Sequence, residues 1–337
     1  MPNHVKSNND LLGPKKSNKW FFSALFLALL LLTLETLNAW AGPKIMTTSY
    51  PVWLFTRYIT QGRDYFEVEL LTNPATGCPH EFAPLPRDLE RLSQSRILIK
   101  NGLGLEVYLD KALKVASKDL IIIDASQGVP TLPLTWGRLD LGELGDKDSP
   151  KAESDKAPLT PNPHIFSSPR LAGLMANNIA LALAKLDPEG SIYYQERKLA
   201  FQADMDYLSH SIQSFKDSRQ GYRVMVSHGF MDYLAQDLGL IVLADIEPIP
   251  ETPPSPSRVQ ALSKLVRSGD INGILVEPEA DLELARILAA EGHFRAAVID
   301  PATSGPANPE DEYYKKVIRD NIIVLSQLFP ANKEVPK

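Results

Sequence analysis

Residues 187–215 read DPEGSIYYQERKLAFQADMDYLSHSIQSF, and this stretch predicts one long helix. Asp187 is a residue that caps helices, and Pro188 fits the first helical turn. From Phe201 onward, large apolar residues recur at three- and four-residue intervals, which indicates one buried helical face. The apolar positions are Tyr194, Phe201, Met205, Leu208, Ile212 and Phe215. At 1.5 Å per residue the helix is about 40 Å long, enough to join two lobes.

Short apolar runs alternate with helical segments on both sides of this helix. Before it we expect strands at 45–49, 66–71, 97–100 and 120–124, and helices at 51–61, 86–94, 105–115 and 169–185. After it we expect strands at 223–227, 240–244, 273–276 and 296–299, and helices at 231–238, 257–266, 280–290 and 310–328. This alternation predicts an α/β fold with two lobes, each a mostly parallel sheet flanked by helices, joined by one long rigid helix.

The N-terminus has the pattern of a secretory signal peptide. Basic residues precede the apolar run Trp20–Leu32, and Ala39-Trp40-Ala41 forms a small-x-small site. An uncleaved membrane anchor is the alternative. We therefore expect a signal peptide at 1–41, an N-terminal lobe at 42–187, a linking helix at 188–217 and a C-terminal lobe at 218–337. The basic residues of the leader are Lys6, Lys15, Lys16 and Lys19.

Charge and cysteine content exclude several classes of protein. The net charge is −6, and removal of the basic leader makes the chain still more acidic, which argues against nucleic-acid binding. Cys78 is the only cysteine, so we expect no internal disulfide and no lipid attached at the end of the leader. The polar segment Gly137–Pro161 has six acidic and four basic residues, and we expect a mobile surface loop there.

Three histidines and one aspartate lie in turn contexts far apart in the sequence: His80, His164, His228 and Asp300. Ligands of open parallel sheets bind outside the carboxyl ends of the strands. His228 and Asp300 follow two expected strands directly, so we expect all four side chains to meet in one crevice. Three imidazoles and a carboxylate suit zinc, and are acceptable to manganese or iron. A four-coordinate site of this kind holds a metal rather than activating water.

Other polar residues are weaker candidates. Glu277 also ends an expected strand, and we rank it below Asp300 as a ligand. Glu81 and Asp232 are possible partners for the second ring nitrogen of a metal-binding histidine. Cys78 could contact a soft metal, although a turn residue is the simpler interpretation. The remaining histidines are expected to be exposed or, for His4, to lie in the leader; the exposed ones are His210 and His293.

In these residues the chain resembles the solute-binding proteins that serve ABC transporters for zinc and manganese. The resemblance covers nearly all of residues 44–329. It depends on Pro79-His80-Glu81-Phe82, Pro86-Arg87-Asp88-Leu89, Asn162-Pro163-His164-Ile165, Lys185-Leu186-Asp187-Pro188, Ser227-His228-Gly229-Phe230 with Tyr233-Leu234, Ile246-Glu247-Pro248 with Pro254-Ser255-Pro256, and Ile299-Asp300-Pro301.

The resemblance implies two α/β lobes joined by a rigid helix, with the metal between them. It also implies that His80, His164, His228 and Asp300 match the ligand positions of the family. Histidine at the position of His228 favours zinc, because manganese binders usually have glutamate there. Unlike many zinc binders of the family, the chain has no histidine in Gly137–Pro161.

The expected function is therefore that of a periplasmic solute-binding protein that captures zinc and delivers it to an ABC permease in the inner membrane. We expect a monomer with no enzymatic activity. One alternative is a manganese- or iron-binding member of the same family. Another is a secreted zinc metallohydrolase, for which Glu81 and Glu277 are the obvious general bases, although the chain has no His-Glu-x-x-His segment. A third is an adhesion protein of this fold that keeps the metal only for structure.

Overall fold

Two separate sheets organise the chain in the computed structural model. The compact part of the chain begins at Gly42, and the expected signal peptide at 1–41 lies outside the described residues. The structure describes residues 42–75, 77, 79, 82–115, 119–134, 138–139, 141–146, 160–247, 252–278, 280 and 282–331.

Each sheet has four parallel strands. In the first sheet the spatial order is β2-β1-β3-β4, and in the second it is β6-β5-β7-β8. In both sheets the second strand in sequence lies at one edge and is followed by the first, the third and the fourth. The two halves of the chain therefore share one topology. The strands are β1 (Lys44–Thr47), β2 (Glu67–Leu70), β3 (Ile97–Lys100), β4 (Ile121–Asp124), β5 (Arg223–Val226), β6 (Ile241–Asp245), β7 (Gly273–Val276) and β8 (Arg295–Val298).

Helices alternate with these strands, which confirms the predicted α/β class. The predicted helix at 105–115 is divided into a 3₁₀ turn at Val107–Leu109 and a short α-helix. The helices are α2 (Tyr50–Thr60), α3 (Pro86–Ser93), α4 (Asp110–Val115), α5 (Pro169–Leu186), α6 (Ser191–Arg219), α7 (Asp232–Leu238), α8 (Pro256–Arg267), α9 (Leu282–Glu291) and α10 (Tyr313–Leu328).

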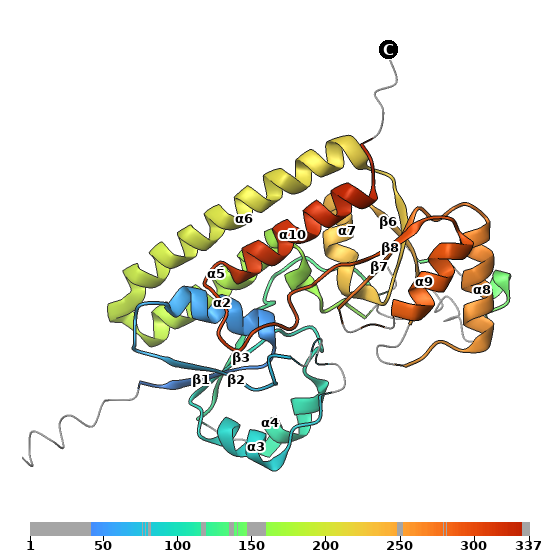
Figure 1. Ribbon diagram of the computed structural model, residues 1–337. Coiled ribbons are helices and arrows are strands. Elements are labelled where there is room, and N and C mark those ends of the chain that lie inside the picture. The colour runs from blue at the N-terminus through green and yellow to red at the C-terminus, as the bar shows by residue number, and fades with distance from the viewer. Residues whose placement is uncertain are drawn as a thin grey trace, which may run out of the picture. The chain divides into compact units, whose positions relative to one another are not determined.

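The long helix α6 has 29 residues and follows a 3₁₀ turn at Pro188–Gly190. The Asp187 carboxylate accepts the Gly190 N–H, so Asp187 caps this 3₁₀ turn. The N-terminal cap of α6 itself is Gly190, so the predicted capping role is confirmed for the turn and not for the α-helix. All six predicted apolar positions are buried. They face α5 and α10, and α10 runs beside α6 in Figure 1.

One hydrophobic core is shared by the two halves of the chain. Ile45 of β1, Phe201 of α6 and Val226 of β5 belong to the same cluster of buried side chains, together with Ile318 of α10. A second cluster, on the other side of the second sheet, packs α8 and α9 against it. Because close-packed interiors resist shear, a core common to both sheets limits how far the lobes can move apart.

The expectation of a mobile surface loop is wrong for the start of the polar segment. Arg138 has a side chain only 9% exposed and pairs with two carboxylates, at 2.7 Å from Asp232 and 2.5 Å from Asp245. Leu141 is buried, and Asp146 pairs with Arg258 at 2.7 Å. These charges lie inside the protein because each has an opposite charge as partner.

Residues 141–146 pack on α8, beside the second sheet, although the sequence division assigns them to the first lobe. Leu139 also donates its N–H to the carbonyl of Leu243 in β6, at 2.8 Å. Residues 138–146 therefore already contact the second sheet and its helix α8, although α6, the helix expected to join the two lobes, comes later in the chain. Residues 147–159 of the same segment lie outside the described residues.

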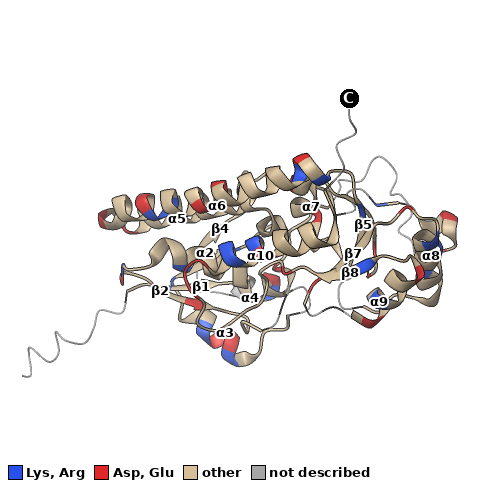
Figure 2. Cartoon of the chain, turned by 45° about the horizontal axis from the view of Figure 1, so that its top comes forward, with Lys and Arg blue, Asp and Glu red and all other residues tan. Residues whose placement is uncertain are grey.

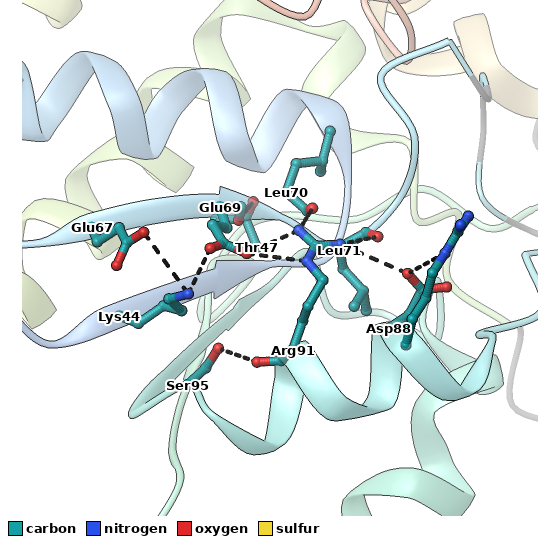
Figure 3. Close-up of polar contacts among 10 residues, drawn as sticks. Lys44, Thr47, Glu67, Glu69, Leu70, Leu71, Asp88, Arg91 and Ser95 are labelled. Atoms are coloured by element: carbon teal, nitrogen blue, oxygen red, sulfur yellow. Dashed lines mark hydrogen bonds and ion pairs between the residues drawn. The ribbon is translucent and has the colours of Figure 1, made fainter.

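Arg91 of α3 holds the end of the edge strand β2. Its guanidinium donates to the carbonyls of Leu70 at 2.7 Å and Leu71 at 3.4 Å and pairs with Glu69 at 3.0 Å (Figure 3). On the same side, Lys44 pairs with Glu69 at 2.7 Å. These contacts fix the point at which the chain leaves β2 toward the motif at 79–82.

Surface charge is mixed in sign. Basic and acidic residues are interspersed along α3 and α6 (Figure 2). None of the helices in the described residues combines the length and the apolar character needed to span a bilayer.

Candidate metal centre

His164 is fully buried in the turn that leads into α5. The Asn162 side-chain oxygen accepts the His164 backbone N–H at 2.9 Å and lies 2.7 Å from ring Nδ1. Asn101, directly after β3, donates from Nδ2 to the carbonyl of Pro163 at 3.0 Å. The first sheet therefore holds this turn from one side, while Ser168 caps the helix that follows.

His228 follows β5 and opens the 3₁₀ turn Gly229–Met231 that leads into α7. It is 4% exposed. Its Nδ1 lies 2.9 Å from Oε1 of Glu277, which directly follows β7. Strands β5 and β7 are parallel neighbours, so their carboxyl ends bring the two side chains together.

The two histidine rings are neighbours, with centroids 5.2 Å apart and planes inclined by 62°. Phe166 packs edge-on against His164, and Phe230 lies beside His228. The structure thus brings together two of the four predicted ligands, one before α5 and one after β5. Their apolar neighbours shield the pair from solvent.

Asp300 lies two residues beyond β8, where the backbone makes a tight turn. Its Oδ1 accepts the Ala302 N–H at 2.7 Å, and Ala302 has φ 60°, in the left-handed region. The Asn321 side chain holds the Asp300 backbone on both sides, accepting its N–H at 3.0 Å and donating to its carbonyl at 2.6 Å. Because β7 and β8 are parallel neighbours in register, Asp300 and Glu277 leave the sheet at the same edge.

The third predicted histidine, His80, lies outside the described residues, as do Cys78 and Glu81. Within the described part of the chain, no group of three or more His, Cys, Asp or Glu side chains is arranged to hold a metal ion. The four-ligand set therefore stays a prediction, of which the His164–His228 pair is the part seen in the described residues.

Several buried oxygen atoms that have no hydrogen-bond partner among the described residues lie beyond the carboxyl ends of strands, in both sheets. They belong to Ser49, Asn101, Ser227, Glu277 and Thr303, which follow β1, β3, β5, β7 and β8. Buried polar groups are normally satisfied. Unpaired oxygen atoms at the carboxyl ends of the strands suit a charged or hydrated ligand, which can supply the missing hydrogen bonds or be bound by the oxygens.

The His228 imidazole is influenced by two opposing effects. Burial disfavours the charged ring, but the hydrogen bond to Glu277 and its negative charge raise the pKa of His228 above the ordinary value of 6.5. For Asp232, burial raises the pKa of the carboxyl to about 7, against the opposing charge of Arg138. The pKa values of His228 and Asp232 therefore depend on the neighbours that surround them in the folded protein.

The sequence model of the family described as "Zinc-uptake complex component A periplasmic" matches residues 45–328. The chain belongs to this family.

Curated relatives of this zinc-uptake component family include the zinc-binding protein AdcA of Streptococcus pyogenes. It is 27% identical over 292 residues, which cover 84% of this chain and 55% of AdcA. The high-affinity zinc uptake system protein ZnuA of Bacillus subtilis is 22% identical over 286 residues, which cover 83% of this chain and 86% of ZnuA. The chain thus spans about half the length of the AdcA proteins that it matches.

A solved structure of similar fold is the SBP FpvC from Pseudomonas aeruginosa in complex with Ni²⁺. The TM-score is 0.70 at 22% identity, and the match covers 85% of this chain and 96% of that chain. At this identity the likeness shows the fold. It agrees with the two parallel sheets and the long helix α6.

The partners of the histidine rings in this member of the zinc-uptake component family differ from those expected. Asp232 contacts Asn162 and Arg138 rather than a ring, and Glu277, ranked as a weaker ligand, is the partner of His228. The sequence motif Asn162-Pro163-His164-Ile165 predicts no role for the Asn162 side chain. Its position two residues before His164 was the available signal, because Asn side chains commonly bond the backbone two residues later.

The two histidines expected outside the site are indeed exposed. His210 lies on the outer face of α6, where its ring contacts the Asp206 carbonyl, and His293 lies in a turn after α9. Both are therefore suitable controls for experiments on the buried pair.

Proposed function

We propose that this protein captures a zinc ion outside the cytoplasm and delivers it to an ABC permease, acting as a solute-binding protein and not as an enzyme. Membership in the zinc-uptake component family supports the transport role. The names of two relatives, a zinc-binding protein and a high-affinity zinc uptake protein, support zinc as the cargo. The family match gives no support to the metallohydrolase alternative.

The observation that carries the proposal is the buried pair His164 and His228. Two imidazoles with ring centroids 5.2 Å apart lie inside the protein, and each has an oxygen beside Nδ1, from Asn162 and from Glu277. Metal-binding histidines have this pattern, in which one ring nitrogen is held by a protein oxygen and the other binds the ion.

The ligand set that we propose is His80, His164, His228 and Asp300. Three nitrogens and one carboxylate match four-coordinate zinc, whereas manganese prefers more oxygen ligands. Glu277 supports His228 instead of completing the set, because its Oε1 already contacts the ring. Asp300 follows β8, the neighbour of β7, and supplies the carboxylate of the proposed set.

The proposed location is the periplasm, reached through a signal peptide at 1–41, with the permease in the inner membrane. The protein acts there as a monomer with lobes at 42–187 and 218–337 and a linking helix at 188–217. The shared core and the long helix favour release through small shifts of loops and lobes rather than wide opening.

Equilibrium dialysis with metal analysis tests the proposal. We expect one zinc ion per chain in the unmodified protein and in His210→Ala, and loss of that ion in His164→Ala and His228→Ala. Competition with manganese and iron(II) then ranks the cargo metals. Equal zinc retention in His164→Ala and His210→Ala would overturn the proposal.

A further inference from the structure

Asn162 connects the buried His164 with a carboxylate on α7. Its Oδ1 lies 2.7 Å from His164 Nδ1, and its Nδ2 donates to Asp232 Oδ2 at 2.8 Å. All three side chains are buried. A histidine that precedes α5 is therefore linked through one amide to a residue that belongs to the second half of the chain.

Only one orientation of the Asn162 amide satisfies its neighbours. Nδ2 lies 2.7 Å from the Gly229 carbonyl and 2.8 Å from Asp232 Oδ2, and both of these atoms are acceptors. Both N–H groups are then used, and Oδ1 must face His164, where it also accepts the backbone N–H. Since Oδ1 can only accept, ring Nδ1 must carry the proton.

This assignment determines which ring atom can bind a metal. A neutral imidazole has one N–H and one nitrogen with a lone pair. With the proton on Nδ1, the lone pair of His164 is on Nε2. The amide therefore sets the tautomer as well as the direction of the ring.

The position of Asp232 is in turn fixed by Arg138. The guanidinium contacts Asp232 Oδ1 at 2.7 Å and is shared with Asp245 at the end of β6. The backbone of Asn162 is held as well, because the Tyr233 hydroxyl donates to its carbonyl at 2.6 Å. Asp232 thus has one oxygen for Arg138 and one for Asn162.

We propose that Arg138, Asp232 and Asn162 form a positioning relay that keeps His164 in the Nδ1–H tautomer with Nε2 as its metal-binding atom. Asp232 controls zinc affinity through a ligand that it does not contact. The part of this inference that concerns zinc rests on the proposed function, while the tautomer is a property of the metal-free protein.

The experiment is ¹⁵N NMR of the histidine rings in the metal-free protein at pH 8, together with zinc titrations. The spectrum of His164→Ala identifies the His164 signals by their absence. We expect Nδ1–H for His164 in the unmodified protein. The tautomer itself is read in the unmodified protein, and an Nε2–H tautomer there would overturn the relay.

Asp232→Asn tests the coupling at constant shape. An amide at 232 must direct its oxygen to Arg138, so it presents an N–H to Asn162 Nδ2. This replaces one of the two acceptors that hold the Asn162 amide in its present orientation by a donor, and leaves the Gly229 carbonyl as the other. We expect the Nε2–H tautomer to become populated and zinc affinity to fall about 10- to 100-fold. The matched control is Asp237→Asn on the same helix, whose carboxylate contacts Ser168 and Arg170; it should leave the tautomer and the affinity unchanged.

The outcomes separate the inference from the proposed function. A folded Asp232→Asn protein with unmodified tautomer and affinity overturns the relay, even if zinc binds at His164. An unmodified protein with the Nδ1–H tautomer that takes up no zinc leaves the relay intact and overturns the transport proposal.

Discussion

The rings of Phe55 and Tyr314 meet edge to face, with centroids 5.0 Å apart. Phe55 lies on α2 beside the first sheet, and Tyr314 lies on α10 near the end of the chain. The Tyr314 hydroxyl also donates to the Phe166 carbonyl at 2.6 Å, two residues after His164. The final helix therefore stabilises the turn that carries a proposed ligand.

Removal of this hydroxyl should destabilise the protein. Tyr314→Phe keeps the ring contact with Phe55 but leaves a buried carbonyl without its donor, so we expect the free energy of unfolding to fall by about 1–2 kcal/mol. Urea denaturation measures the change. Tyr207→Phe, at a 54% exposed position on α6, is the control and should have no measurable effect.

The buried ion pair at the start of the polar segment should contribute far more than an exposed one on the same helix. Arg258 pairs with Asp146, and both side chains are at most 5% exposed, whereas the side chain of Arg267 is 64% exposed in its pair with Glu291. Arg258→Met leaves a buried carboxylate without its cation, and we expect a loss of about 3 kcal/mol of unfolding free energy. Arg267→Met should lose less than about 1 kcal/mol. Similar losses in both variants would show that residues 141–146 are not firmly docked.

The contribution of Asp187 to stability should depend on pH. The hydrogen bonds from Arg63, at 2.6 and 2.8 Å, lower the pKa of the Asp187 carboxyl, with a further bond from the Tyr194 hydroxyl at 2.7 Å. A depressed native pKa stabilises the fold above the unfolded pKa of about 3.9, and this contribution disappears as the pH falls below that value.

Asp187→Asn should therefore lower the free energy of unfolding by about 2 kcal/mol at pH 7, with a difference that shrinks toward pH 3. Denaturation curves at several pH values measure this. The exposed Asp206→Asn provides the control. A difference between Asp187→Asn and the unmodified protein that is the same at pH 3 and pH 7 would contradict the assignment.

Zinc binding should weaken in acid as His228 becomes protonated, because protons and zinc compete for the neutral imidazole. Glu277 raises the pKa of His228 in spite of burial. Glu277→Gln removes the charge at nearly constant shape, so the pKa of His228 should fall in the metal-free protein. NMR titration of the ring protons measures it, with the exposed Glu196→Gln as control. An unaltered His228 pKa in Glu277→Gln would refute the role of this carboxylate.

Local patterns allowed the elements to be predicted, because they depend on residues close in sequence. The apolar spacing from Phe201 to Phe215 is sufficient to predict α6, and all these residues are buried as expected. The burial of Arg138 could not be predicted in this way. Its partners, Asp232 and Asp245, come from the second half of the chain and approach it only in the folded protein.

In the candidate site, too, some features follow from residues close in sequence and others depend on tertiary contacts. His164 and His228 could be selected from their turn contexts, and the structure makes them neighbours. Their supporting residues depend on tertiary structure: Glu277 reaches His228 because β5 and β7 pair, and the sequence does not specify strand order. Asn162 lies only two residues before His164, so its contact with His164 could be expected from the sequence. Its orientation depends on Asp232, which is distant in the sequence.

The core common to both sheets has a consequence for biosynthesis. Ile318 and Leu325 of α10 pack in the same cluster as Ile45 of β1, so that cluster stays incomplete until residues near Phe329 have left the ribosome. We therefore expect folding to follow translation rather than to proceed lobe by lobe during it. A nascent chain that stays unfolded until then remains able to thread through a narrow translocation channel.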